Sequence, residues 1–157
     1  MNSRFLSYAL AFVAALALSA PTDANAHKVH KVAIHVNDSD PKRQNMALNN
    51  ALNLNKFYEA RGEKVIIEIV TYGPGLMMLR EDKSKVKDRI AQMSLAMPNL
   101  SFAACGNTLK KMTEREGKVP PLIAEAKNVP SGVVRLMELQ EAGYRAPLKI
   151  TCWATVC

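Results

Sequence analysis

Cys105 has the clearest chemical potential in this chain because of the residues on either side of it. The short apolar run at residues 100–104 predicts a buried strand that ends at the cysteine. Turn and helix-cap residue types follow directly, in the order Gly106, Asn107 and Thr108. A thiol placed there faces the N-terminus of the next helix, whose partial positive charge lowers a thiol pKa and favours the nucleophilic thiolate. A small buried residue would suit the same position, since free cysteine packs as an ordinary hydrophobe. Position alone therefore leaves both interpretations open.

Polar or glycine-containing segments follow three other predicted strands, and they are candidates for the same site. They are Asn37 and Asp38, then Gly73, Pro74 and Gly75, and then Ser131 and Gly132. In a parallel sheet, ligands bind at the carboxyl ends of the strands, so these segments are expected to converge near the cysteine. Helix capping and tight turns would also account for all of them without a binding role.

Several of these candidates would have distinct roles in thiol chemistry. The backbone amides of Gly106, Asn107 and Thr108 would stabilise an anion on the sulfur. Gly106 also lacks a Cβ, which would let a donor approach closely. Asn37 is favoured over Asp38 as a hydrogen-bonding helper, because a nearby carboxylate would raise the thiol pKa and oppose activation.

Alternating strands and helices are predicted to position these residues. Strands are expected at residues 29–36, 65–70, 100–104, 127–129 and 144–150. Helices are expected from Pro41, capped by Asp40, to Gly62; at residues 76–79; after a cap at Asp82 or Ser84; from Thr108 to Glu116 before Gly117; and from Val133 to Ala142 after Ser131. This alternation predicts an α/β fold of three layers, with a parallel sheet of about five strands and helices on both faces.

Residues 1–26 have the composition of a signal peptide. A positive charge precedes an apolar stretch at residues 5–18 that is too short to span a bilayer, and small residues precede a cleavage site after Ala26. We therefore expect a periplasmic or secreted protein with a single domain at residues 27–150 and an atypical cysteine-containing tail at residues 151–157. No membrane segment is expected after cleavage. An uncleaved N-terminal anchor is the alternative.

Export would place the three cysteines in an oxidising compartment. Their odd number leaves at least one thiol unpaired within a monomer. Cys152 and Cys157 lie close together in the tail and could form a local disulfide, which would leave Cys105 free. Alternatively, Cys105 pairs with one of the tail cysteines and loses its nucleophilic chemistry.

The net charge and the motifs of the sequence indicate which classes of partner and cofactor to expect. The formal charge is +7, but the Lys and Arg residues spread over predicted helices without interleaved aromatic residues. This pattern is typical of solvated faces rather than of a nucleic-acid interface, although small anionic substrates would still be attracted. His27, His30 and His35, with the methionines, could offer copper ligands. A loose terminus, a strand interior and core packing account for them better, so no metal is expected. The sequence has no phosphate loop, CxxC pair or dinucleotide fingerprint, and no cofactor is expected.

Five segments, in this order, resemble the DsrE/DsrF-like family, in particular its small exported members. The matching pieces are residues 32–38, 40–45 with 47–50, 72–75, 102–108 with the run Ala-Cys-Gly-Asn-Thr, and 129–135 with 138–140. Together they span most of the chain between residues 29 and 144. The segment from Arg145 to Cys157 departs from the family pattern.

The resemblance implies a parallel α/β sheet that assembles into trimers or hexamers. By analogy with the family's sulfur-relay members, it implies that Cys105 carries sulfur as a persulfide. The expected function is therefore an exported sulfur carrier or sulfurtransferase that exchanges sulfur with a donor or acceptor protein. The alternative is a non-catalytic oligomeric protein of the periplasm that binds a small ligand or anion, for example at Ser131 and Gly132.

Overall fold

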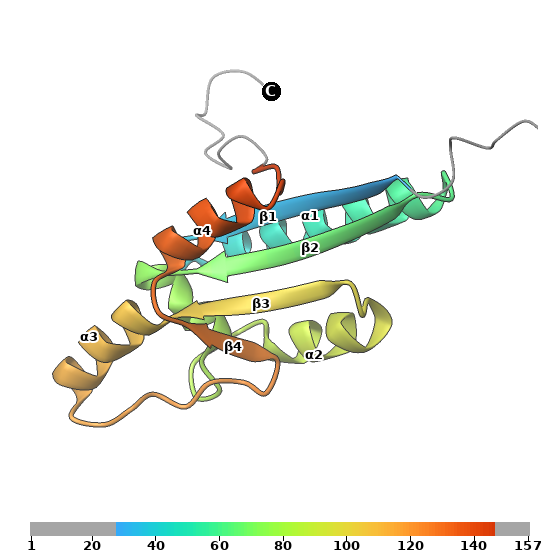
Figure 1. The fold of residues 1–157 in the computed structure, drawn as a ribbon. Helices are drawn as coiled ribbons and strands as arrows, with labels where there is room; N and C mark the ends of the chain where they lie inside the picture. Colours follow the sequence, from blue (N-terminus) through green and yellow to red (C-terminus); the bar gives the residue numbers. More distant parts are fainter. Residues whose placement is uncertain (1–27, 147–157) are drawn as a thin grey trace, which may run out of the picture.

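A parallel four-stranded sheet forms the centre of the protein, in a computed structural model that describes residues 28–146. The strands are β1 (Val29–Val36), β2 (Lys64–Thr71), β3 (Leu100–Cys105) and β4 (Ala126–Val129). They lie side by side in chain order, and every neighbouring pair is parallel (Figure 1). The α/β class predicted from the alternation of elements is confirmed.

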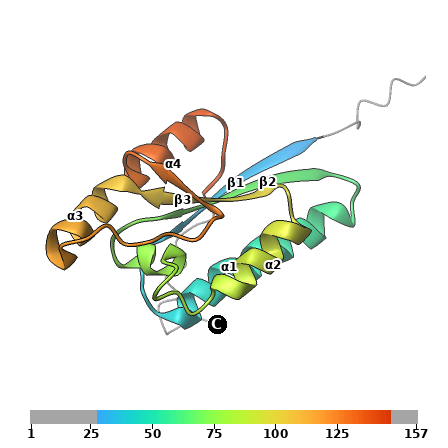
Figure 2. The ribbon, with the colours of Figure 1, turned by 90° about the horizontal axis from the view of Figure 1, so that it is seen from below.

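The helices cover both faces of this sheet and its carboxyl edge. Helices α1 (Pro41–Glu59) and α2 (Lys87–Ala96) lie on one face, and α4 (Gly132–Glu141) lies on the other (Figure 2). Helix α3 (Gly106–Glu116) and the 3-10 helix η1 (Gly73–Leu79) gather near the ends of β2 and β3. This three-layer arrangement follows from strands that are apolar on both faces.

The two faces of the sheet bury unequal cores. The larger core includes Ile34, Ile69 and Phe102 on the face under α1 and α2. Alternate residues of the same strands, Ala33, Val70 and Ala103, form a small cluster with Leu139 of α4. Small strand residues on this second face let α4 lie close to the sheet, and Cys105 falls in the same alternation as Ala103.

Helix α1 begins as the sequence predicts, whereas the cap proposed for α2 was wrong. Asp40 is the N-cap of α1, and its carboxylate accepts from the Lys42 N–H at 2.9 Å. Helix α2 has no side-chain cap, because its N-cap position is Val86. Ser84 instead accepts from the Val86 N–H at 3.2 Å, and Asp82 pairs with Arg80. Asp82 therefore forms an ion pair with Arg80 and does not cap α2.

Helix α3 starts two residues earlier than predicted. Its N-cap position is Cys105 itself, so the strand leads straight into the helix without an intervening turn. Thr108 is consequently inside the first turn rather than a capping residue. Gly117 ends the helix in the left-handed conformation, as expected from its position. Ser131 occupies the N-cap position of α4, but its hydroxyl makes no capping bond.

The chain returns to the free side of β1 after α4. Arg145 forms a parallel bridge with Val32, and its N–H donates to the Lys31 carbonyl at 2.9 Å. The predicted fifth strand therefore has its first residues beside β1, while residues 147–150 and the tail lie outside the described part of the chain. The predicted signal peptide also lies outside it. Within residues 28–146, no helix is both long and apolar enough to cross a membrane.

Candidate functional site

Cys105 lies at the carboxyl end of β3, beneath the start of α4. Its register partner is Val129 of β4, and only 4% of the residue is exposed. A Cβ added to Gly132 would lie 3.3 Å from the Cys105 Cβ, so the first turn of α4 comes close to the thiol. The sulfur is therefore enclosed between the first turns of two helices, α3 and α4.

Hydrogen-bond donors from the first turns of α3 and α4 surround this sulfur. Burial raises the pKa of the Cys105 thiol, but the Thr108 hydroxyl and the backbone N–H groups of Gly132, Thr108 and Asn107 lower it by more. The net result is a thiol pKa below its ordinary value. An enclosed cysteine with no such donors would have a raised pKa instead. The arrangement therefore favours a thiolate over a structural thiol.

Thr108 is oriented to donate toward the sulfur. Its Oγ1 accepts a hydrogen bond from the Gly73 N–H at 2.9 Å. With that lone pair occupied, the hydroxyl hydrogen is free to point at Cys105. Gly73 thus acts through its backbone, and its positive φ of 54° suits a glycine.

Gly106 and Gly132 are both needed for close backbone approach. A Cβ on Gly106 would lie 2.9 Å from the Val129 carbonyl oxygen, and the Asn107 N–H donates to the Pro130 carbonyl at 3.1 Å. The space beside Gly106 is therefore filled by the β4–α4 connection rather than left open for a donor. A Cβ on Gly132 would lie 3.0 Å from the Tyr72 Cβ, so Tyr72 flanks the same turn.

The segment after β1 is used for local structure. The Asp38 carboxylate accepts from the Asp40 N–H at 2.8 Å and pairs with Arg43 at 3.1 Å. Neither Asn37 nor Asp38 is among the groups that shift the Cys105 pKa. A Cβ on Gly75 would lie 2.1 Å from the Val36 carbonyl oxygen, so this glycine serves packing. Two strand spacings, about 10 Å, separate β1 from β3, which explains why the helper role proposed for Asn37 finds no support.

Tyr72 and His35 are neighbours of the site that sequence reasoning missed. Tyr72 Oη and His35 Nδ1 are hydrogen-bonded at 2.9 Å, and both side chains are half-buried. His35 is on the same face of β1 as Ala33, and the register of β1, β2 and β3 places this face on the Cys105 side of the sheet. His30 faces the other side of β1, where it stacks on Tyr58 of α1 and pairs with Glu63. The two histidines therefore cannot ligate one metal ion.

An ion pair fixes α4 over the sheet. Arg135 donates from Nε and a terminal nitrogen to the two oxygens of Glu68, at 2.7 and 2.9 Å. Glu68 lies in the middle of β2 and is buried. The hydrogen bonds that its carboxylate accepts raise the pKa of the Arg135 guanidinium, against the opposing effect of burial. This bidentate pair holds the turn that carries Gly132 in place.

One solved structure places this fold among known proteins. A protein of unknown function from Methanobacterium thermoautotrophicum is similar, with a TM-score of 0.63 and 28% sequence identity over 75% of this chain and 97% of that chain. No family model matches the chain, and no curated protein matches it. The comparisons support the α/β fold, and membership of the DsrE/DsrF-like family stays a prediction.

Proposed function

We propose that this protein is a sulfur carrier or sulfurtransferase that holds sulfur as a persulfide on Cys105. The observation that supports it is an enclosed sulfur beside the Thr108 hydroxyl and the Gly132 N–H, which together with neighbouring N–H groups give a lowered thiol pKa. A merely structural cysteine needs no such donors, because burial among apolar groups satisfies it. The resemblance of residues 102–108 to the DsrE/DsrF-like motif points to the same chemistry.

The proposed reaction is one nucleophilic displacement at sulfur. The Cys105 thiolate attacks the outer sulfur of a donor R–S–SH, a new S–S bond forms, and the S–S bond of the donor breaks. The donor leaves as the thiolate R–S⁻, which takes up the electron pair, and the proton remains on the transferred sulfur. Hydrogen bonds to the Cys105 sulfur stabilise the attacking anion, and the lower pKa makes it available near neutral pH.

Intact mass tests this function directly. The chain with Cys152→Ser and Cys157→Ser is exposed to thiosulfate or to a small hydropersulfide, and a gain of one sulfur atom is expected. The gain should disappear when Cys105→Ser is added. No gain with either donor, together with slow alkylation of Cys105 at neutral pH, would contradict the proposal.

We also propose that the protein is exported and forms a homo-oligomer. Val133, Val134 and Met137 on the outer side of α4 are 55%, 50% and 56% exposed, and they would be buried in a trimer or hexamer. The composition of residues 1–26 supports export. Size exclusion with light scattering should give an oligomer, and a monomer at high concentration would count against this part of the proposal.

A further inference from the structure

A cavity of about 800 Å³ lies at the carboxyl edge of the sheet, between η1 and α3. Gly73, Pro74 and Met77 line it from η1, and Thr108 and Met112 line it from α3. Its volume is within the range of small-molecule sites. None of these lining residues except Thr108 and Gly73 belongs to the thiol site described above.

Thr108 belongs to both the cavity and the thiol site. Its side chain lines the cavity, and its hydroxyl hydrogen-bonds the Cys105 sulfur. The Thr108 hydroxyl therefore connects the cavity wall to the Cys105 sulfur. A molecule bound in the cavity therefore contacts the side chain that lies beside the thiol.

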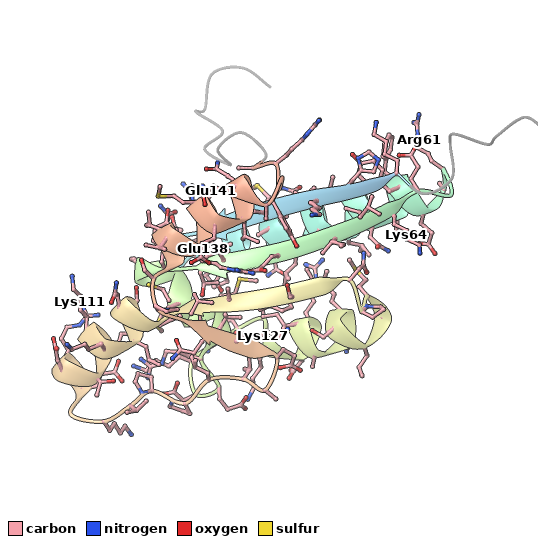
Figure 3. The ribbon with its side chains drawn as sticks, in the orientation of Figure 1. Arg61, Lys64, Lys111, Lys127, Glu138 and Glu141 are labelled. Carbon is pink, nitrogen blue, oxygen red and sulfur yellow. The ribbon has the colours of Figure 1, made fainter. Side chains whose placement is uncertain are left out.

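One side of α3 forms a wall of the cavity and carries two positively charged side chains. Thr108, Lys111, Met112 and Arg115 recur at helical spacing, so they share one side of the helix. Lys111 projects from α3 near the carboxyl edge of the sheet (Figure 3). The rise along seven residues places Arg115 about 10 Å from Thr108. This wall therefore extends from Thr108, beside the thiol, to the positively charged side chains of Lys111 and Arg115.

The chemistry of the lining specifies a class of ligand. Met77, Met112 and Pro74 supply apolar and polarisable surface, whereas Lys111 and Arg115 supply two cations against the single carboxylate of Glu114. Such a site suits a small molecule with an apolar middle and one or more anionic groups. Arg115 is also oriented, because its Nε donates to the Lys111 carbonyl at 3.3 Å.

The two walls of the cavity are tied together beyond its apolar part. Arg80, which directly follows η1, is 1% exposed and donates to Glu116 at the end of α3 at 2.9 Å. It also donates to Asp82 at 2.7 Å. These charge-assisted bonds fix η1 against α3, so the cavity is preformed rather than assembled by its ligand.

We infer that this cavity binds the sulfur donor or the released thiol, and that the molecule is a small organic thiol bearing carboxylates. This inference rests on the proposed function of Cys105 and adds the substrate class. The carboxylates lie toward Lys111 and Arg115, and the sulfur end lies toward Thr108. The reaction is the displacement given above, with R–S⁻ as a thiolate that also carries carboxylates.

Binding of S-methylglutathione, measured by titration calorimetry, tests this site without any sulfur transfer. This thioether carries two carboxylates and cannot donate or accept sulfur. Saturable binding is expected, with affinity lowered about fivefold by Lys111→Met and by Arg115→Met. Lys110→Met is the matched control, since Lys110 is exposed on the same helix but does not line the cavity, and it should leave affinity unchanged. The dimethyl ester of the probe should bind far more weakly.

The outcomes separate this inference from the proposed function. No saturable binding, or an equal loss with Lys110→Met, overturns the cavity assignment. Sulfur transfer from thiosulfate to Cys105 could still be found in that case, and the proposed function would stand. Conversely, cavity-dependent binding of S-methylglutathione without any sulfur gain on Cys105 would support the ligand site and reject the sulfur carrier.

Discussion

Arg135 of α4 and Glu68 of β2 are joined by two parallel hydrogen bonds, at 2.7 and 2.9 Å, across 67 residues of chain. Three residues before Arg135, the N–H of Gly132 donates to Cys105. The ion pair therefore positions a donor of the thiol site without touching the thiol. Glu138 also accepts from Arg135, at 3.3 Å, but its side chain is exposed (Figure 3).

Glu68→Gln should destabilise the protein by about 2 kcal/mol, because it replaces a buried charge-assisted pair with a weaker bond. It should also slow alkylation of Cys105 at neutral pH, since a looser α4 weakens the Gly132 donor. Glu138→Gln removes the exposed partner of the same arginine and should change stability by less than about 0.5 kcal/mol. Urea unfolding and iodoacetamide rates measure both effects. Equal losses in the two variants would contradict the positioning role.

Thr108→Val should raise the pKa of Cys105, because it removes a hydrogen-bond donor and keeps the side-chain shape. The thiolate fraction at neutral pH falls as this pKa rises, and the alkylation rate should fall with it. Thr108→Ser should restore most of the rate. Thr113→Val is the control, since its hydroxyl donates to the Leu109 carbonyl elsewhere on α3. A pH–rate profile that is the same in Thr108→Val and the unaltered chain would refute the role of this hydroxyl.

The sequence signals for the fold were local, and they were sufficient for the α/β class. Apolar and β-branched runs located β1, β2 and β3, and Asp40 with Pro41 located the start of α1. Cys105 was recognised as the end of a strand because Gly106 and Asn107 follow it. Each of these conclusions depends on residues within a few positions of one another.

The composition of the thiol site could not be predicted in the same way. The Gly132 donor depends on where α4 crosses the sheet, and the ion pair with Glu68, a charged residue inside an otherwise apolar stretch of β2, helps to set that position. Thr108 turned inward only because α3 begins at Gly106, two residues before the expected start. The pairing of His35 with Tyr72 joins β1 to the residue after β2, and it depends on the two strands being neighbours in the sheet. Tertiary placement, not residue type, decided these contacts.

Gly132→Ala should disturb the thiol site more than the fold. The added Cβ would lie 3.0 Å from the Tyr72 Cβ and 3.3 Å from the Cys105 Cβ, so the first turn of α4 and its neighbours must separate by a few tenths of an ångström. A stability loss of about 1–3 kcal/mol is expected from such crowding. The displaced Gly132 N–H would no longer lower the thiol pKa, and the pH midpoint of alkylation should rise. An unchanged midpoint would show that this N–H is not a functional donor.

Stability itself should depend on pH through Cys105. Because folding lowers the thiol pKa, the unfolded chain binds more protons than the folded chain between the two pKa values. Stability from this group therefore rises with pH across that window, is complete above the unfolded value of about 8.5, and is lost as pH falls through the folded value.

The comparison is made between the chain with Cys152→Ser and Cys157→Ser and the same chain with Cys105→Ser added. Other titrating groups cancel in the difference between their free energies of unfolding. That difference should grow in favour of the cysteine chain as the pH rises from the lowered folded pKa to the unfolded value of about 8.5. A difference that stays flat would mean that the thiol titrates alike in both states. A difference that falls with rising pH would mean that burial outweighs the hydrogen-bond donors, and the carrier proposal would lose its main support.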